Sequence, residues 1–261
     1  MAARRRGLGF WLGLFGLGLV LALWLAPAFA LRFALAPLAA RAGGVGEVEG
    51  VWPALPFGVR ASHLHVASEG RVLDLDDLRA VWTPWRTRVD ARVADGTLLF
   101  RGEGLRADSG FLRLQGVALE SLEPLLAAPL ALRGVADGIW RFGAEASIEG
   151  SVSRGAIVLR RAGSFELPFA QLVLSAARES PTAGWDVRFV DVQGPPLSAS
   201  ASGTIGADGA LALSAQVRQL EEPVLSLFPL LQLPTGPLPL ALAVEGSLSA
   251  PRLVATGAAP D

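Results

Sequence analysis

His63 and His65 are the residues of this chain best suited to metal chemistry, and they are its only histidines. Successive side chains of a β-strand point to opposite faces, so this i, i+2 spacing places both imidazoles on one face, opposite Leu64 and Val66. A tetrahedral zinc site needs more ligands than two imidazoles, and the sequence places no others beside them. We therefore expect a solvated strand surface here and no metal site.

Asp74, Asp76 and Asp77 form a second group with chemical potential, either for calcium binding or for acid catalysis. The group lacks the regular spacing of oxygen ligands in a calcium loop. Asp74 and Asp76 alternate with Leu73 and Leu75, which is typical of the wetter face of a strand. The expected role of these carboxylates is to face solvent.

The sequence contains no motif of an enzyme active site. It has no nucleophile elbow, phosphate-binding loop or dinucleotide-binding glycine pattern. Because it has no cysteine, it has no thiol nucleophile, disulfide or thiolate ligand. We expect no catalytic residue, no cofactor and no enzymatic activity.

Five tryptophans outside the N-terminal segment offer large apolar surfaces. They are Trp52, Trp82, Trp85, Trp140 and Trp185. Core packing is the commoner use of such rings, and a ligand groove is the alternative.

The segments that carry these residues alternate between apolar and polar positions after about residue 45. The clearest runs are 88–93, 211–218 and 238–245. This alternation is typical of strands with one buried and one wetter face. Pairs of turn-forming residues recur along the chain: Asp95-Gly96, Asp137-Gly138, Asp208-Gly209 and Ser202-Gly203. Since Asp-Gly pairs favour tight hairpins, the pattern predicts an antiparallel sheet.

One run breaks the alternation. Trp185, Val187 and Phe189 share a face, whereas Val190 and Val192 fall on the other. Either a β-bulge or a strand buried on both faces would explain the change of phase.

Two segments with helical spacing interrupt the strands. The first contains Leu119, Leu122, Leu125 and Leu126, and the second contains Leu220, Val224, Leu227, Phe228 and Leu231. Both carry acidic residues early, which favours a helix start. The pattern PLLxxP recurs at 124–129 and 229–234, each time after a Gly-x-Leu-x-Leu strand. We therefore hypothesise a twice-used unit of strand, short helix and strand.

An uncharged segment of 25 residues, 7–31, is long enough for a transmembrane helix. Arg4, Arg5 and Arg6 precede it, and positive residues stay on the cytoplasmic side. The alternative is a cleaved signal peptide ending at Ala30, although its apolar region would be longer than usual. Both interpretations export the rest of the chain. The net charge of −1 argues against binding nucleic acid.

Two stretches of sequence resemble a known family. They are Val48-Glu49-Gly50-Val51-Trp52 with the following Leu-Pro-Phe-Gly segment at 55–58, and 244–253 near the other end. These stretches, behind an N-terminal anchor, resemble protein N of the type II secretion system (GspN). The resemblance implies an inner-membrane helix, a β-rich periplasmic domain and no catalytic residues. The closing Gly-x-Leu-x-x-Pro pattern and Ser202-Gly203-Thr204-Ile205 also resemble the AsmA and TamB group of envelope proteins, whose β-grooves are associated with lipid movement.

The sequence thus predicts a mainly β protein with a cytoplasmic N-terminus at 1–6, a transmembrane helix at 7–31 and a linker at 32–44. A β-rich periplasmic domain with two short helices follows at 45–257, in two repeated halves by the hypothesis above, with a tail at 258–261. The resemblance implies an accessory component of type II secretion that contacts other components of that machine. The alternative is an AsmA-like protein that handles lipid. A lipid carrier needs an open apolar strip along its sheet, whereas a scaffold would close that face as a core.

Overall fold

The computed structural model describes residues 25–26, 28, 44–55, 57–68, 71–104, 106–121, 130–159, 165–221, 238–247 and 250–256. These residues are mainly in β-strands, and every described strand pairing is antiparallel. The predicted mainly β, antiparallel fold is therefore confirmed. The strands divide between two compact units, and β6 (Gly96–Glu103) contributes residues to both.

The first unit comprises Met1–Ala94 and Leu99–Ala107. Its strands are β1 (Gly44–Glu49), β2 (Trp52–Ala54), β3 (Gly58–Ser68), β4 (Arg71–Trp82) and β5 (Arg86–Val93). They pair in the order β1-β3-β4-β5, and β2 pairs with β3. Ala61, Leu78 and Ala91 form its buried cluster, one from each of β3, β4 and β5. The alternation of Val89, Ala91 and Val93 with charged neighbours produces this buried face, as the sequence predicts.

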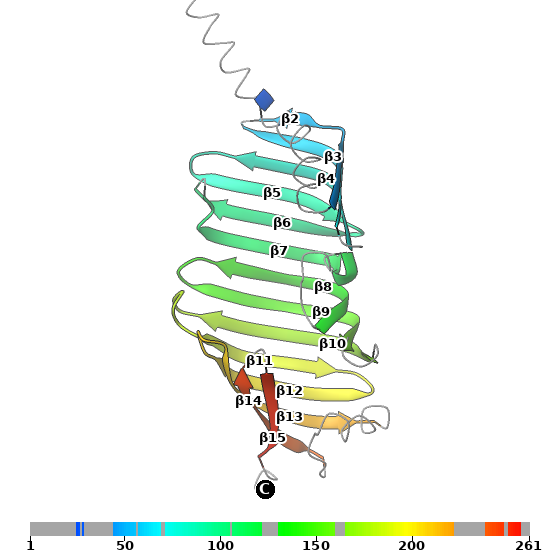
Figure 1. The fold of residues 1–261 in the computed structure, drawn as a ribbon, viewed down its shortest axis with the longest axis vertical. Helices are drawn as coiled ribbons and strands as arrows, with labels where there is room; N and C mark the ends of the chain where they lie inside the picture. The colour runs from blue at the N-terminus through cyan, green and yellow to red at the C-terminus, as the bar shows by residue number, and fades with distance from the viewer. Residues whose placement is uncertain are drawn as a thin grey trace, which may run out of the picture. The chain divides into compact units, whose positions relative to one another are not determined.

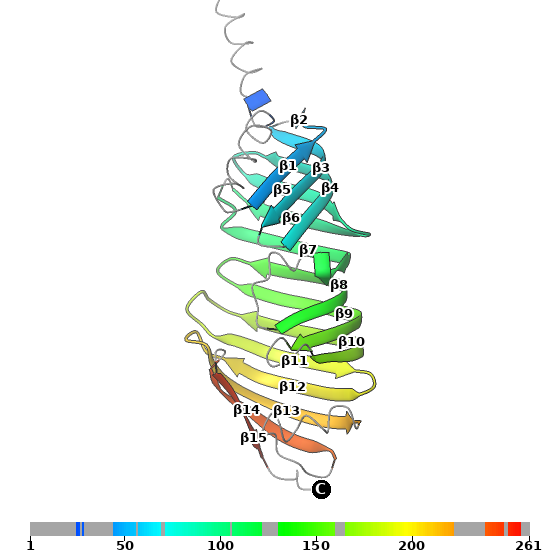
Figure 2. The ribbon, with the colours of Figure 1, turned by 45° about the vertical axis from the view of Figure 1, so that its right-hand side comes forward.

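The second unit comprises Asp95–Leu98 and Asp108–Asp261. Its strands are β7 (Ser109–Ala118), β8 (Leu130–Phe142), β9 (Ala146–Leu159), β10 (Phe165–Arg178), β11 (Trp185–Gln193), β12 (Leu197–Ile205), β13 (Ala210–Leu220), β14 (Leu240–Ser247) and β15 (Ala250–Ala255). Each strand pairs with the next one in the chain, so that β7 to β13 lie side by side in sequence order (Figure 1). Figure 2 shows that β8, β9 and β10 curve out of a flat plane. A buried cluster of Val217, Leu220 and Leu242 joins β13 to β14.

Two of the four predicted turns are wrong. Asp95-Gly96 and Asp208-Gly209 do connect β5 to β6 and β12 to β13. Asp137-Gly138 instead lies inside β8, and Ser202-Gly203 lies inside β12. In β8 the Asp137 side chain accepts a hydrogen bond from the backbone N–H of Gly116 at 2.9 Å, so it bonds to the neighbouring strand and not to a turn of its own. The glycine of each pair allows the backbone of a neighbouring strand to approach closely, because a Cβ at Gly138 or Gly203 would overlap with it.

A β-bulge explains the broken alternation in β11. The register with β12 shifts between Val187 and Val190, and the register with β10 shifts opposite the same segment. The extra residue returns Val190 to the face of Val187, because a slip of one residue changes the face of every later side chain. The structure thus decides between the two alternatives in favour of the bulge.

The predicted short helices are described only in part. Residues 119–121 form one turn of 3₁₀ helix, and Leu220 belongs to β13, which corrects its assignment to a helix. The remaining residues of both segments, including the two PLLxxP patterns, lie outside the described residues. So does the predicted transmembrane segment 7–31, except for Leu25, Ala26 and Ala28. Within the described parts of the chain there is no helix of sufficient length and apolar character to cross a membrane.

Candidate functional site

The apolar face of the second unit forms continuous rows of side chains that run across its strands. Residues paired across an antiparallel sheet point to the same face, so the register defines these rows. Each row takes one residue from every strand from β7 to β14. The first row is Val117, Ala136, Val152, Leu172, Val192, Ala199, Val217 and Leu240. The second is Leu114, Gly138, Gly150, Leu174, Val190, Ala201, Ala215 and Leu242. The third is Leu112, Trp140, Ile148, Ala176, Val187, Gly203, Leu213 and Val244. We call the three rows the apolar strip.

The apolar strip contains no charged or hydrogen-bonding side chain other than the indole of Trp140. Within the three rows this uniformity depends on two bulges, one in β7 between Leu114 and Val117 and one in β11 between Val187 and Val190, which each restore the apolar side chains to the same face. Sequence periodicity alone does not show the strip, because it reads each bulge as a change of face.

The strip is hollowed where two glycines face each other. Gly138 of β8 and Gly150 of β9 are register partners in the second row, and Leu114 and Leu174 stand on either side of them. Since neither glycine has a side chain, the surface between the two leucines is formed by the backbone and lies lower than its surroundings. The resulting groove has a volume of about 480 Å³, within the range of small-molecule sites. We call it the apolar groove.

The walls of the apolar groove come from the neighbouring rows. They include Leu112, Trp140, Ile148, Val152 and Leu172, and Leu119 of the 3₁₀ turn also lines the groove. Glu120 holds that turn against β8, because its carboxylate accepts a hydrogen bond from the N–H of Gly134 at 3.2 Å. Trp140 remains 46% exposed, so its ring is available to a ligand and is not packed into a core.

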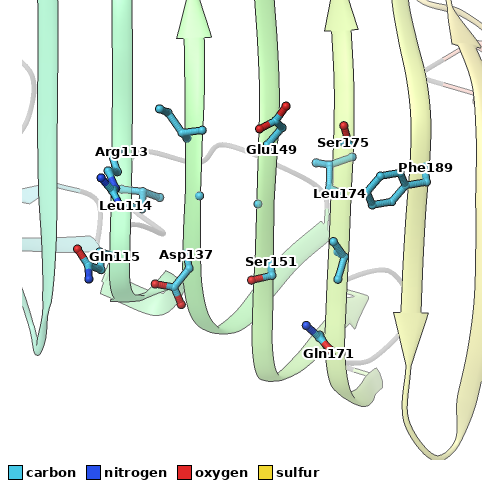
Figure 3. A pocket seen from close by; sticks show the side chains of 14 residues that line it. Arg113, Leu114, Gln115, Asp137, Glu149, Ser151, Gln171, Leu174, Ser175 and Phe189 are labelled. Atoms are coloured by element: carbon cyan, nitrogen blue, oxygen red, sulfur yellow. The ribbon is translucent and has the colours of Figure 1, made fainter.

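The opposite face of the same strands carries most of their polar side chains, together with Ile139, Val173 and Phe189. Figure 3 shows the side chains of Arg113, Gln115, Asp137, Glu149, Ser151 and Gln171 projecting there from neighbouring strands. They line a hollow of about 820 Å³ that shares Gly138 and Gly150 with the apolar groove. The sheet in this region therefore has one more polar and one apolar surface. At the glycine pair, no side chain adds to the thickness of the sheet between them.

The histidines lie in the first unit, where β3 and β4 pair. The register places His63 opposite Asp76 and His65 opposite Asp74. His63 Nδ1 lies 2.8 Å from Asp76 Oδ1, and His65 Nδ1 lies 2.6 Å from Asp74 Oδ1. The hydrogen bond with Asp76 raises the pKa of His63 above its ordinary value of 6.5. Asp74 and Asp76 are exposed, as the sequence predicts, but they face imidazoles and not solvent alone.

Asp77 does not join this group. It has a positive φ of 47°, at the point where the register between β4 and β5 shifts, and it pairs with Arg92 at 2.6 Å. The predicted acidic cluster is therefore divided, with two carboxylates beside the histidines and the third beside an arginine.

Three of the five tryptophans do not follow the expectation of core packing, whereas Trp82 and Trp185 are half-buried. Trp52, Trp85 and Trp140 are exposed by 69%, 75% and 46%. Trp185 lies beneath the guanidinium of Arg178, whose central carbon is 5.2 Å from the ring centre. Of the five, Trp140 lines the apolar groove.

No protein-family model, no curated protein and no solved structure matches the chain.

Sequence reasoning missed the apolar groove, although part of its signal was visible. The Asp137-Gly138 pair favours a turn when it is read alone, and the sequence predicts no role for Gly150. A glycine inside a strand marks close approach of a ligand or of another backbone, and two such glycines in facing strands are the pattern that predicts a groove.

Proposed function

We propose that the protein handles lipid in the cell envelope, holding an acyl chain in the apolar groove of its second unit. The observation that carries the proposal is the apolar strip, which is continuous over the strands from β7 to β14 and hollowed at the Gly138–Gly150 pair. A protein that used this face only as its core would fill the hollow with side chains.

The energetics fit a flexible apolar ligand. Each methylene that leaves water contributes about 0.8 kcal/mol, so eight methylenes along the groove would contribute roughly 6 kcal/mol before the cost of ordering the chain. The strip carries no charged side chain and so favours an acyl chain over a polar ligand. Because the sequence has no catalytic motif, we propose that the protein binds lipid without carrying out a reaction on it.

The predicted membrane anchor supports the same function. A single helix at 7–31 would hold the groove near a bilayer that supplies lipid. The likeness of 202–205 and 244–253 to the AsmA and TamB group points in the same direction. We infer an inner-membrane location with the β-strands in the periplasm.

Lipid binding can be tested with a pair of variants that add the same charge to opposite faces of β10. Leu172→Glu places a carboxylate in the apolar groove, whereas Gln171→Glu places one on the polar face. The full-length proteins would be purified in mild detergent, and the lipid that co-purifies would be measured by mass spectrometry. We expect lipid with the wild type and with Gln171→Glu, and at least about tenfold less with Leu172→Glu, because burying a carboxylate beside an acyl chain is costly. Equal lipid in all three proteins would contradict the proposal.

Tryptophan fluorescence provides a second test at the groove itself. A fatty acid brominated along its chain quenches nearby indoles, and Trp140 lines the groove. We expect quenching of the wild type to lose its saturable part in Trp140→Phe. Unchanged quenching in that variant would place the ligand elsewhere.

A second candidate function is that of an accessory component in type II secretion, as the likeness to protein N implies. One observation favours a contact with a partner protein. In the described residues β15 pairs only with β14, and its Leu253 and Val254 are 40% and 45% exposed. An exposed edge of this kind can accept a strand from a partner.

The two candidates differ in the phenotype of a deletion strain. A secretion component should leave exported enzymes in the periplasm while the outer membrane stays intact. A lipid-handling protein should leave secretion normal and alter the permeability of the outer membrane. Complementation with Leu172→Glu adds a further distinction, since that variant should fail only if the groove is needed.

A further inference from the structure

The structure brings both histidines of the chain and two aspartates to one surface of the first unit. His63 and His65 alternate along β3, and their register partners on β4 are Asp76 and Asp74. The two imidazole rings are stacked, with their centres 6.4 Å apart and their planes at 24°. The side chains of this group are between 30% and 53% exposed, so ions in solution can reach them.

Three of these side chains lie close enough together to ligate one metal ion after small rotations. Ligand atoms of His63, His65 and Asp74 all lie within 4.8 Å of one another. The distance from His63 Nε2 to Asp74 Oδ1 is 3.6 Å. Zinc bonds of about 2.0–2.1 Å at tetrahedral angles place two ligand atoms roughly 3.3 Å apart. His65 Nδ1 is closer to Asp74, at 2.6 Å, and would have to give up that hydrogen bond to a shared ion.

Asp76 has the position of an orienting residue. Its carboxylate lies 2.8 Å from Nδ1 of His63, so it can accept the proton of that nitrogen and leave Nε2 as the free ligand atom. A carboxylate that holds the outer nitrogen of a histidine ligand is a common feature of zinc sites, because it fixes both the tautomer and the ring orientation.

The surrounding charge favours a cation. On the other side of β3, the register places Glu49 opposite His63 and Glu47 opposite His65. Two imidazoles therefore lie between two pairs of carboxylates, one on β1 and the other on β4. Arg92, on β5, is the register partner of Asp76, and its guanidinium forms an ion pair with Asp77 at 2.6 Å.

We propose that His63, His65 and Asp74 bind a divalent transition metal ion, with zinc as its best representative, and that Asp76 orients His63. Three protein ligands leave one position for water or for a group from a partner. Imidazole ligands select transition metals over Mg²⁺, which prefers oxygen alone.

The test measures binding of Zn²⁺ to the full-length protein by isothermal titration calorimetry. The protein carries a purification tag without histidine, so that His63 and His65 stay the only imidazoles present. We expect one Zn²⁺ per chain and no competition from a large excess of Mg²⁺. Asp76→Asn removes the orienting partner and should weaken Zn²⁺ binding roughly tenfold. His65→Ala and Asp74→Asn each remove a ligand and should weaken it by more than that.

Asp77→Asn is the matched control, because it removes a carboxylate of the same strand that pairs with Arg92 and does not belong to the group of His63, His65 and Asp74. Its Zn²⁺ affinity should equal that of the wild type. Circular dichroism of each variant confirms that its strands are retained; should His65→Ala lose them, His65→Gln replaces it. Absence of stoichiometric binding, or equal affinity in Asp74→Asn and Asp77→Asn, would overturn the proposal.

A second readout reports on the ligands directly. Co²⁺ bound in place of Zn²⁺ gives intense visible absorption only in tetrahedral geometry with protein ligands. We expect this absorption in the wild type and in Asp77→Asn, and its loss in His63→Gln. A spectrum of hexahydrated Co²⁺ in the wild type would overturn the assigned geometry.

Discussion

His63 shows how one cross-strand neighbour changes the chemistry of a side chain. Its imidazole lies beside Asp76, with Asp74 and Glu49 adding favourable interactions with the protonated ring. The hydrogen bond to Asp76 is the largest cause of the raised pKa, and removal from water opposes it. The residue is solvent-accessible, so solvent and salt screen these interactions.

The raised pKa of His63 predicts a pH dependence in metal-free protein. A histidine whose pKa is higher in the folded than in the unfolded state stabilises the fold fully below about 6.5, and that contribution is lost as the pH rises through the raised value. We expect Asp76→Asn to return the pKa of His63 toward 6.5 and to reduce the change in unfolding free energy between pH 5.5 and 8.5. The imidazole NMR signals of the two histidines measure the pKa, with His65→Gln for assignment. An unchanged pKa in Asp76→Asn would contradict the assigned cause.

Gly203 is a residue whose small size is required by its strand pairing. Its φ is +139°, and a Cβ there would lie 2.3 Å from the carbonyl oxygen of Ala212. We expect Gly203→Ala to lower the unfolding free energy by more than about 3 kcal/mol, because backbone strain and overlap with a neighbouring strand add. Chemical denaturation measures the loss.

Gly104→Ala is the control for that substitution. Gly104 has a φ of +70°, but a Cβ there would meet no atom within 4 Å. The cost should therefore be only the conformational one, roughly 1–2 kcal/mol. Similar losses in both variants would show that the close approach to Ala212 contributes nothing.

The bulge of β11 illustrates how an element sets the surface of the whole sheet. Val187, Val190 and Val192 share the apolar face because the strand carries an extra residue between the first two. Arg188 is exposed, and Phe189 lies toward the polar face, where it lines the polar hollow. The bulge thus accommodates one extra residue in β11 while the three valines all remain in the apolar strip.

Two single-residue deletions in β11 should have opposite outcomes. Deleting Arg188 removes the extra residue and leaves Val187, Val190 and Val192 in simple alternation, so we expect a loss of no more than about 1 kcal/mol. Deleting Asp191 instead moves Val192 to the polar face and removes the ion pair with Arg218 at 2.5 Å. We expect that loss to exceed about 3 kcal/mol. Thermal denaturation of the two variants provides the comparison, and equal losses would contradict this account of the bulge.

At the scale of the molecule, the apolar groove and the histidine surface, formed by His63, His65, Asp74 and Asp76, lie in two separate compact units. The groove belongs to the second unit and the histidines to the first. Lipid binding and metal binding can therefore be removed independently by Leu172→Glu and His65→Ala, which keeps the two proposals separately testable.

The predicted transmembrane anchor at 7–31 can be tested by deletion. Removing residues 1–30 should release the chain from the membrane pellet into the soluble fraction, since no later segment of the sequence is long and apolar enough to replace it. Fractionation after a high-salt wash measures the outcome. Retention of the truncated protein would reveal a second attachment, and adding Leu172→Glu to it would show whether the apolar groove provides that attachment.

The sequence by itself determined the class of the fold and the polarity of individual strands. Period-two alternation at 88–93 and 211–218 predicted faces that the structure confirms, because alternation is a local property of extended backbone. It also led to the expectation of exposed Asp74 and Asp76. Each of these inferences depends only on a residue and its neighbours in the sequence.

The tertiary structure decided everything that depends on register. Whether Gly138 meets Gly150, or Asp74 meets His65, follows from which residues face each other across strands. A bulge also changes the face of later residues without any separate mark in the sequence. The Asp137-Gly138 pair favours a turn when read locally, although it lies inside β8. The apolar groove and the histidine surface both arise from pairing between strands, and local periodicity contains no information about that pairing.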